Sequence, residues 1–146
     1  MAAVSAAIAD DTVPDIITDQ SAGVEDDRGF VKWELSYHTA IRFHIGDYRR
    51  CLNYGNRIVR GEPDMEMQHR ADVPRCRKAR DEAIEASINT LRDREIKVMN
   101  EDDVREAFRV VGLIHIERGK NIDDQFVRRR AALEAVGRAS PMASDQ

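Results

Sequence analysis

The spacing of mostly apolar residues between positions 30 and 60 constrains the fold of this chain more than any other feature. These residues recur at steps of three and four: Phe30, Trp33, Tyr37, Ile41, His44, Tyr48, Cys51, Gly55 and Ile58. Such steps put them on one face of an α-helix, because a helix turns once every 3.6 residues. Gly61 suits a helix C-terminus, and Pro63 cannot continue the hydrogen-bond ladder. The sequence therefore predicts a first helix over residues 30–60.

Three further helices are predicted after a loop over residues 61–74. Ala, Ile and Leu recur at helical spacing over residues 75–99. Asn100 is a good N-cap, and the three acids that follow it suit the positive end of a helix dipole over residues 101–118. Asn121 and its acids repeat that device, so we expect a last helix over residues 122–137. The β-branched "RVVGLIHI", residues 109–116, leaves a strand open as an alternative to part of the helix over residues 101–118.

Composition supports an all-α fold. Charged residues make up 34% of the chain and aromatic residues 5%, which is typical of helical proteins rather than sheets. A length of 146 residues fits one domain. We expect a helical bundle over residues 29–138 and a flexible tail over 139–146. The sequence has no apolar run of about 18 residues or more, so no transmembrane span is predicted.

The N-terminal segment differs from the rest of the chain in its charge. Residues 1–28 contain seven acidic residues and a single basic one, Arg28, whereas the whole chain has a net charge of −4. Such a segment cannot bury enough apolar surface to fold alone, so a flexible acidic arm is predicted over residues 1–28. The segment has neither the apolar core of a secretory signal nor the arginine-rich character of a transit peptide.

The residue types that carry catalysis or bind metals form no recognisable motif. Cys51 and Cys76 have neither metal-ligand nor redox spacing, and a disulfide between them is open but unsupported, so reduced thiols are the default expectation. The four histidines form no metal-binding pattern. Phosphate-binding loops and nucleophile elbows are also missing from the sequence. We therefore expect a protein that is not an enzyme and that binds no metal or cofactor directly.

Two features of the predicted first helix point to a partner. Its side opposite the apolar face carries Arg42, Arg49, Arg50, Arg57 and Arg60 within an arc of about 100°. A strip of positively charged side chains attracts an acidic partner or phosphate. Small residues stand where leucine would fill a bundle: Cys51, Gly55, Ala83 and Gly112. Either the helices pack closely there or an apolar channel holds a guest.

The heptapeptide "GDYRRCL", residues 46–52, resembles the signature of the LYR-motif family of small three-helix proteins. Tyr48 and Arg49 match the motif, and Asp47 replaces its leucine. Downstream, "REIKVMN" followed by "EDDVREAFRVVGLIHIERGK" is similar to the end of the second helix, a short break and a third helix with a central glycine. Lys97 stands where the family has a phenylalanine. The resemblance covers residues 30–125.

The resemblance implies a fold and a function. The fold would be a three-helix LYR-like bundle with an additional C-terminal helix. The chain would be an accessory subunit or assembly factor of a mitochondrial respiratory complex, most like those of complex I, on the matrix side of the inner membrane. It would dock an acyl carrier protein whose acyl-phosphopantetheine enters the channel lined by Cys51, Gly55, Ala83 and Gly112. Tyr48 and Arg49 would contact the carrier protein because they match the motif. Arg42, Arg50 and Arg57 would do so because they lie on the same arc of the helix.

Three alternatives stay open. One is a helical nucleic-acid-binding module, because "VRRR" at residues 127–130 forms a basic cluster; the net negative charge and the acidic first turns oppose it. A second is a small subunit of another respiratory complex such as cytochrome bc1, which "EDDVREAFR" resembles locally. A third is a stand-alone bundle with an unrelated ligand.

Overall fold

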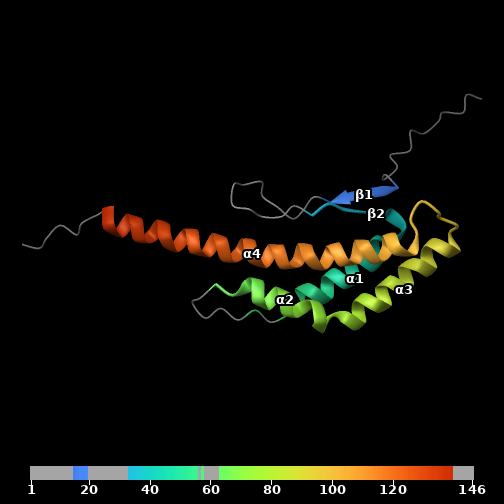
Figure 1. Cartoon of the computed structure of the whole chain (residues 1–146), viewed down its shortest axis with the longest axis horizontal. Helices are drawn as coiled ribbons and strands as arrows, with labels where there is room; N and C mark the ends of the chain where they lie inside the picture. Colours follow the sequence, from blue (N-terminus) through green and yellow to red (C-terminus); the bar gives the residue numbers. More distant parts are fainter. Residues whose placement is uncertain (1–14, 20–32, 56, 58–62, 140–146) are drawn as a thin grey trace, which may run out of the picture.

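The computed structural model describes residues 15–19, 33–55, 57 and 63–139. Its elements in chain order are β1 (Ile16–Asp19), β2 (Leu35–His38), a 3-10 turn η1 (Thr39–Ile41), α1 (Arg42–Asn53), α2 (Met65–Arg75), α3 (Arg77–Asp93) and α4 (Glu101–Ala139). The all-α class is confirmed, with the two strands as a minor addition. The strands lie on one side of the long helix α4, and α1, α2 and α3 lie on the other (Figure 1).

The first predicted helix begins later than expected. Leu35 and Tyr37 of β2 are buried and Ser36 between them is exposed, which is the two-residue period of a strand. β2 pairs antiparallel with β1, with Ile17 opposite Tyr37. The prediction of an acidic arm is therefore wrong for residues 16–19. Residues 1–14, 20–32, 56 and 58–62 lie outside the described residues, as do the tail residues 140–146.

The buried face of α1 is rotated from the predicted one. Ile45, Tyr48 and Leu52 are almost fully buried, whereas His44 and Cys51 are only half-buried. The Tyr48 ring packs against Phe108 of α4, with ring centroids 5.8 Å apart. The spacing of α1 fitted two neighbouring faces, and packing against both α3 and α4 selected the more apolar one.

The predicted loop over residues 61–74 is largely the helix α2. Its start is capped from another helix: the Asp123 carboxylate of α4 accepts hydrogen bonds from the backbone N–H groups of Met65, at 2.7 Å, and Glu66, at 2.8 Å. Pro74 lies in the last turn, just before the chain bends at Cys76 and α3 begins. A cap supplied by a residue 58 positions away has no local sequence signature.

The predicted helix over 75–99 is shorter, and its end is defined by a left-handed residue. α3 ends at Asp93, and Glu95 follows with φ of 54°. Helix α4 begins as predicted after Asn100. The Asn100 side chain accepts a hydrogen bond from the Asp103 N–H, and the Asp103 carboxylate accepts one from the Asn100 N–H, both at 2.8 Å. This reciprocal capping box confirms the Asn100 prediction.

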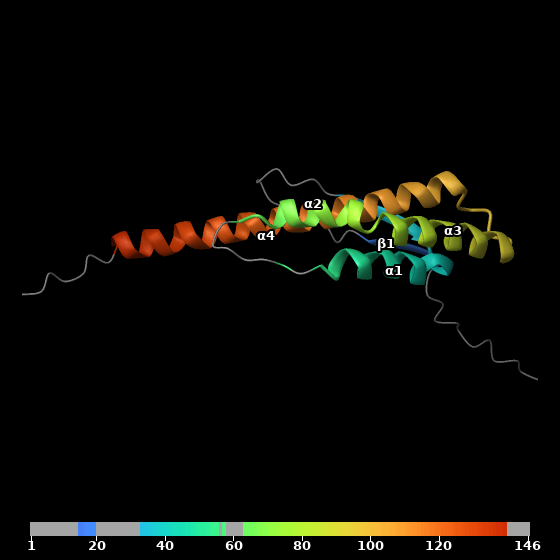
Figure 2. The ribbon, with the colours of Figure 1, turned by 90° about the horizontal axis from the view of Figure 1, so that it is seen from below.

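The two predicted helices 101–118 and 122–137 are one continuous helix, and the strand alternative for "RVVGLIHI" is also wrong. Gly119 lies against the start of α2, where a Cβ atom would be 2.6 Å from the Met65 carbonyl oxygen and 2.8 Å from the His69 ring. Gly119 therefore permits a close helix–helix contact and does not end the helix. Figure 2 shows that α4 extends well beyond both α1 and α2.

The core lies where the first half of α4 meets the other elements. Val104 and Phe108 of α4 are fully buried together with Ile41 and Ile45. Within the described ranges, no helix combines the length and the apolar character that crossing a bilayer would need.

Candidate functional site

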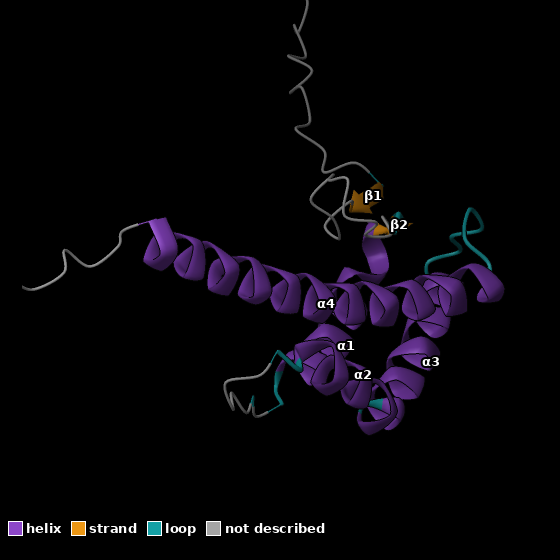
Figure 3. Cartoon of the chain, turned by 60° about the vertical axis from the view of Figure 1, so that its left-hand side comes forward, coloured by secondary structure: helices purple, strands orange, loops and turns teal. Residues whose placement is uncertain are grey.

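The C-terminal half of α4 projects from the bundle. The buried residues of α4 end at Gly119, and every residue from 125 to 139 is exposed. Figure 3 shows this half of the helix extending away from α1, α2 and α3. We call residues 122–139 the distal segment and residues 101–121 the proximal segment.

The distal segment carries apolar side chains on one face. Ile122, Phe126, Leu133 and Val136 are exposed by 43%, 40%, 66% and 63%. With Arg129 they fall within an arc of about 80°, at about 100° per residue. We call these five residues the distal stripe. A face of this kind on a helix usually packs against another element.

The distal stripe continues the face by which α4 packs on α2. His115 and Gly119 precede Ile122 by seven and three residues, are buried, and contact α2. α2 runs antiparallel to α4, and its first residue lies beside Asp123. The distal stripe therefore starts at the point on α4 beyond which α2 no longer covers it. One seam therefore runs along α4, covered by α2 in the proximal segment only.

The charges beside the distal stripe are partly neutralised within the chain. Arg128 pairs with Asp124 at 2.9 Å, and the Arg130 guanidinium lies 5.8 Å from the centroid of the Phe126 ring. Asp123 is engaged in capping α2. Arg129 occupies the middle of the stripe, seven residues from both Ile122 and Val136.

The structure distributes the predicted carrier-protein contacts over different surroundings. Arg49 pairs with Asp19 of β1 at 2.8 Å, Arg50 pairs with Asp47, and Arg57 pairs with Asp72 at 2.8 Å. The Arg42 guanidinium lies 5.3 Å from the centroid of the exposed Phe43 ring.

Tyr48, the other motif residue, faces the core. It is buried against Phe108, and this burial raises the pKa of its hydroxyl. Arg49 and Tyr48 therefore do not form one exposed surface, and three of the predicted arginines already contact acids of this chain.

The residues predicted to line an acyl channel lie in filled space. A Cβ atom on Gly112 would meet the Tyr48 hydroxyl at 3.2 Å, and one on Gly55 would lie 2.9 Å from an Asp72 carboxylate oxygen. Ala83 is buried in the core. These surroundings match the close-packing alternative for the small residues.

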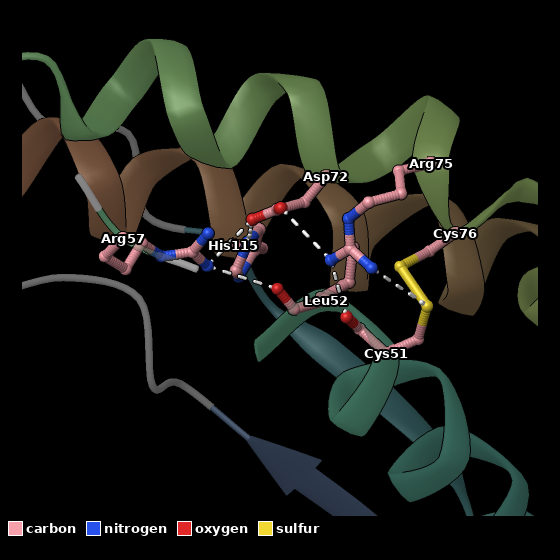
Figure 4. The surroundings of a disulfide bond; sticks show 7 residues. All are labelled: Cys51, Leu52, Arg57, Asp72, Arg75, Cys76 and His115. Atoms are coloured by element: carbon pink, nitrogen blue, oxygen red, sulfur yellow. Dashed lines mark hydrogen bonds and ion pairs between the residues drawn. A yellow bond between two sulfur atoms is a disulfide. The ribbon is translucent and has the colours of Figure 1, made fainter. Parts of the chain in front are cut away.

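Cys51 forms a disulfide with Cys76, with Cα atoms 5.9 Å apart (Figure 4). The expectation of reduced thiols is therefore wrong. The bond joins the C-terminal turn of α1 to the junction of α2 and α3. The spacing of 25 residues gave no sign of the pairing, because the helices bring the cysteines together.

Beside the disulfide lies a buried polar cluster centred on Asp72 (Figure 4). Its carboxylate pairs with Arg57 at 2.8 Å and with Arg75 at 3.1 Å, and accepts a hydrogen bond from His115 Nε2 at 2.7 Å. Burial alone would raise the pKa of Asp72, but the hydrogen bonds from His115, Arg57 and Arg75 outweigh it and hold the pKa below its usual value.

Two histidines complete the cluster. The rings of His69 and His115 stack with centroids 4.1 Å apart, and His69 Nδ1 donates to the His115 carbonyl oxygen at 2.6 Å. Burial, with a smaller contribution from the neighbouring His69, lowers the pKa of His115 to about 4, against the opposing hydrogen bond to Asp72. His115 is therefore neutral at pH 7 and donates from Nε2 to Asp72.

The cluster holds α1 in place. Arg75 donates to the Cys51 carbonyl oxygen at 2.7 Å, and Arg57 donates to that of Leu52 at 3.2 Å, so both guanidinium groups cap the end of α1 while pairing with Asp72. Sequence reasoning missed His69, Asp72 and His115. Their only local signal is that His69 and Asp72 share a helical face at a spacing of three.

The described residues contain no group of three or more His, Cys, Asp or Glu side chains arranged to hold a metal ion. No family model, curated protein or solved structure matches this chain. The likeness to LYR-motif proteins accordingly rests on the residues quoted above and stays a prediction.

Proposed function

We propose that this chain is a non-catalytic helical subunit that joins a larger assembly by packing its distal segment against a helix of a partner protein. The observation that carries the proposal is the distal stripe, which continues the α2-facing seam of α4 beyond α2 itself. The disulfide, the capping box and the Asp72 cluster then serve to hold the bundle from which the distal segment projects.

The energetics of an uncovered helix support a partner. The distal segment is an extension of a packed helix, and its residues 125–139 are all exposed within the chain, whereas most helix stability in proteins comes from packing of an apolar face. Full burial of a side chain such as Leu133 contributes about 1.5–3 kcal/mol. Further burial of the four apolar side chains on the stripe would therefore contribute favourably to association with a partner.

The buried polar groups support a structural role over a catalytic one. Asp72 is saturated by three donors, and the neutral His115 is enclosed between it and His69. A general acid or base has to reach a substrate. Among the described residues, the contacts of these groups are all with other parts of the bundle.

Site-specific photo-crosslinking in cells of the source organism tests the proposal. A photoreactive residue at Leu133, on the stripe, should give one or a few defined adducts with another protein. The same residue at Ala131 lies about 180° away on the helix and is the matched control. Equal labelling from both positions, or adducts from neither, would contradict the proposal.

Docking of an acyl carrier protein on α1, as part of a respiratory complex in the mitochondrial matrix, stays a narrower prediction. Co-expression with that carrier and intact mass spectrometry test it. A stable 1:1 pair that retains acyl-phosphopantetheine, and that high salt or Arg49→Glu weakens, would support it. A folded chain that forms no such pair would remove its main support.

A further inference from the structure

We infer that the partner helix is acidic where it faces the middle of the distal stripe, so that one of its carboxylates pairs with Arg129. This inference rests on the proposed function and adds the chemistry of the partner. It starts from the position of Arg129, a cation on the same arc as four apolar side chains.

Arg129 differs from its two neighbouring arginines. Arg128 is paired with Asp124, and Arg130 stacks on Phe126. In the part of the chain that the structure describes, no carboxylate pairs with Arg129. A helix that covers the stripe would desolvate Arg129, and a desolvated guanidinium is costly unless a carboxylate meets it. An aspartate or glutamate at that place satisfies it, with the option of two parallel hydrogen bonds.

A second copy of this chain does not fit the stripe. In a parallel pairing in register, Arg129 faces Arg129 of the other copy. In an antiparallel pairing, Ile122 meets Val136 and Phe126 meets Leu133, so the centre of the pairing falls at Arg129 and the same two cations meet. Both arrangements that bury all four apolar residues therefore oppose like charges, which is the device by which coiled coils exclude wrong partners.

A nucleic acid fits the stripe less well than a protein helix. Leu133 and Val136 flank the cation on the same face and are more than half exposed. Phosphate contacts would leave these apolar side chains in water, whereas an amphipathic helix covers them and supplies the carboxylate.

The probes for the experiment are two synthetic amphipathic helices of about three heptads with leucine and isoleucine along one seam. They are identical except at the seam position facing Arg129, which is glutamate in one peptide and lysine in the other. Binding to the full chain is followed by fluorescence anisotropy, and the site by hydrogen exchange at residues 122–139. We expect the glutamate peptide to bind about tenfold or more tightly than the lysine peptide and to protect the distal segment.

Charge exchange in the protein sharpens the result. Arg129→Glu should reverse the preference and favour the lysine peptide. Arg138→Glu makes the same change of charge about 180° from Arg129 on the helix, and should leave the preference within about twofold of the unsubstituted chain. A preference that does not respond to Arg129→Glu, or that responds equally to Arg138→Glu, would overturn the inference.

Light scattering coupled to size-exclusion chromatography gives an independent measurement. We expect the unsubstituted chain to be a monomer and Arg129→Leu, which completes the apolar stripe, to self-associate with increasing concentration. An unsubstituted dimer whose distal segment is protected from exchange would overturn the inference in favour of a second copy. Salt-sensitive binding of duplex DNA that protects residues 122–139 more strongly than the glutamate peptide would overturn it in favour of a nucleic acid.

The outcomes separate this inference from the proposed function. Equal binding of both peptides, with protection of the distal segment, would rule out the acidic partner but support a distal segment that binds helices. If neither peptide protects the distal segment, both the inference and the proposed function are ruled out. Tight binding of the glutamate peptide, lost in Arg129→Glu, supports both.

Discussion

Two phenylalanines on one helix show how differently the two halves of α4 are used. Phe108 in the proximal segment is fully buried against Tyr48, whereas Phe126 in the distal segment is 40% exposed. Both belong to the same face of the helix, and the residues around them recur with the same spacing. The difference is the presence of α1 and α2 beside the proximal segment. A repeating apolar face thus shows where a helix can pack against a neighbour. Which part of that face is buried within the chain depends on where the other helices lie.

The strongest way to break this comparison is to truncate both rings. Phe108→Ala should lower the free energy of unfolding by about 3–5 kcal/mol, because it leaves a cavity in a packed core. Phe126→Ala should change it by less than about 1 kcal/mol, because the site is open to water. Urea denaturation followed by circular dichroism measures both. Similar losses in the two variants would mean that the distal face is covered in the isolated chain.

Reduction of the disulfide tests what holds the proximal half. Breaking Cys51–Cys76 should lower the free energy of unfolding by about 3 kcal/mol, since a closed loop of this length restricts the unfolded chain. Hydrogen exchange should increase in α1 and α2, with little change at residues 125–139. The control is the same reductant on Cys51→Ala/Cys76→Ala. A loss of protection confined to the distal segment would contradict the comparison.

Acidification should weaken the proximal half only. The pKa of His115 is lowered from 6.5 to about 4, so between these values the unfolded chain binds the proton and the folded chain does not. The free energy of unfolding is therefore highest above pH 6.5 and decreases as the pH falls toward 4. The decrease is at most about 3 kcal/mol, at 1.36 kcal/mol per pKa unit.

At lower pH, protonation of Asp72, whose pKa is also lowered, should decrease the free energy of unfolding further. Thermal or urea unfolding between pH 7 and 4 measures the slope, and His115→Gln should flatten it. A slope unchanged by that substitution would show that other groups carry the pH dependence.

The smallest expected effect compares two glycines of α4. Gly119→Ala should lower the free energy of unfolding by about 1–3 kcal/mol, because its Cβ would contact the Met65 carbonyl oxygen and force α2 away. At Gly137 an added Cβ atom would have open space around it, so Gly137→Ala should raise helix stability by about 0.5–1 kcal/mol. Equal effects at the two positions would mean that α2 does not approach α4 as described.

Part of the fold was predictable because its causes are local. The capping box at Asn100 depends on residues three positions apart, and the helical period of residues 101–137 was correctly assigned. β2 was missed because Trp33, Tyr37 and Ile41 fit a helical period, while Leu35 between them indicates the strand. α2 was missed because its cap, Asp123, comes from another helix.

The candidate site was partly predictable in the same sense. Sequence reasoning placed a helix over residues 122–137 and noted its basic cluster, but assigned partner binding to the arginines of residues 42–60. Two of those arginines, Arg49 and Arg57, contact acids that are distant in the chain, and only the folded arrangement reveals these pairs. Arg50 contacts Asp47 three residues away on the same helix, a spacing that the sequence itself contains.

By itself the sequence determined the helical period, the all-α class and the placement of Arg129 among apolar residues, since these depend on spacing along the chain alone. The tertiary structure decided that Gly119 accommodates a neighbour instead of ending a helix, that Cys51 meets Cys76, and that the apolar face of α4 is covered in one half and exposed in the other. Each of those outcomes depends on which element approaches in space, and that is set by the packing of the whole bundle.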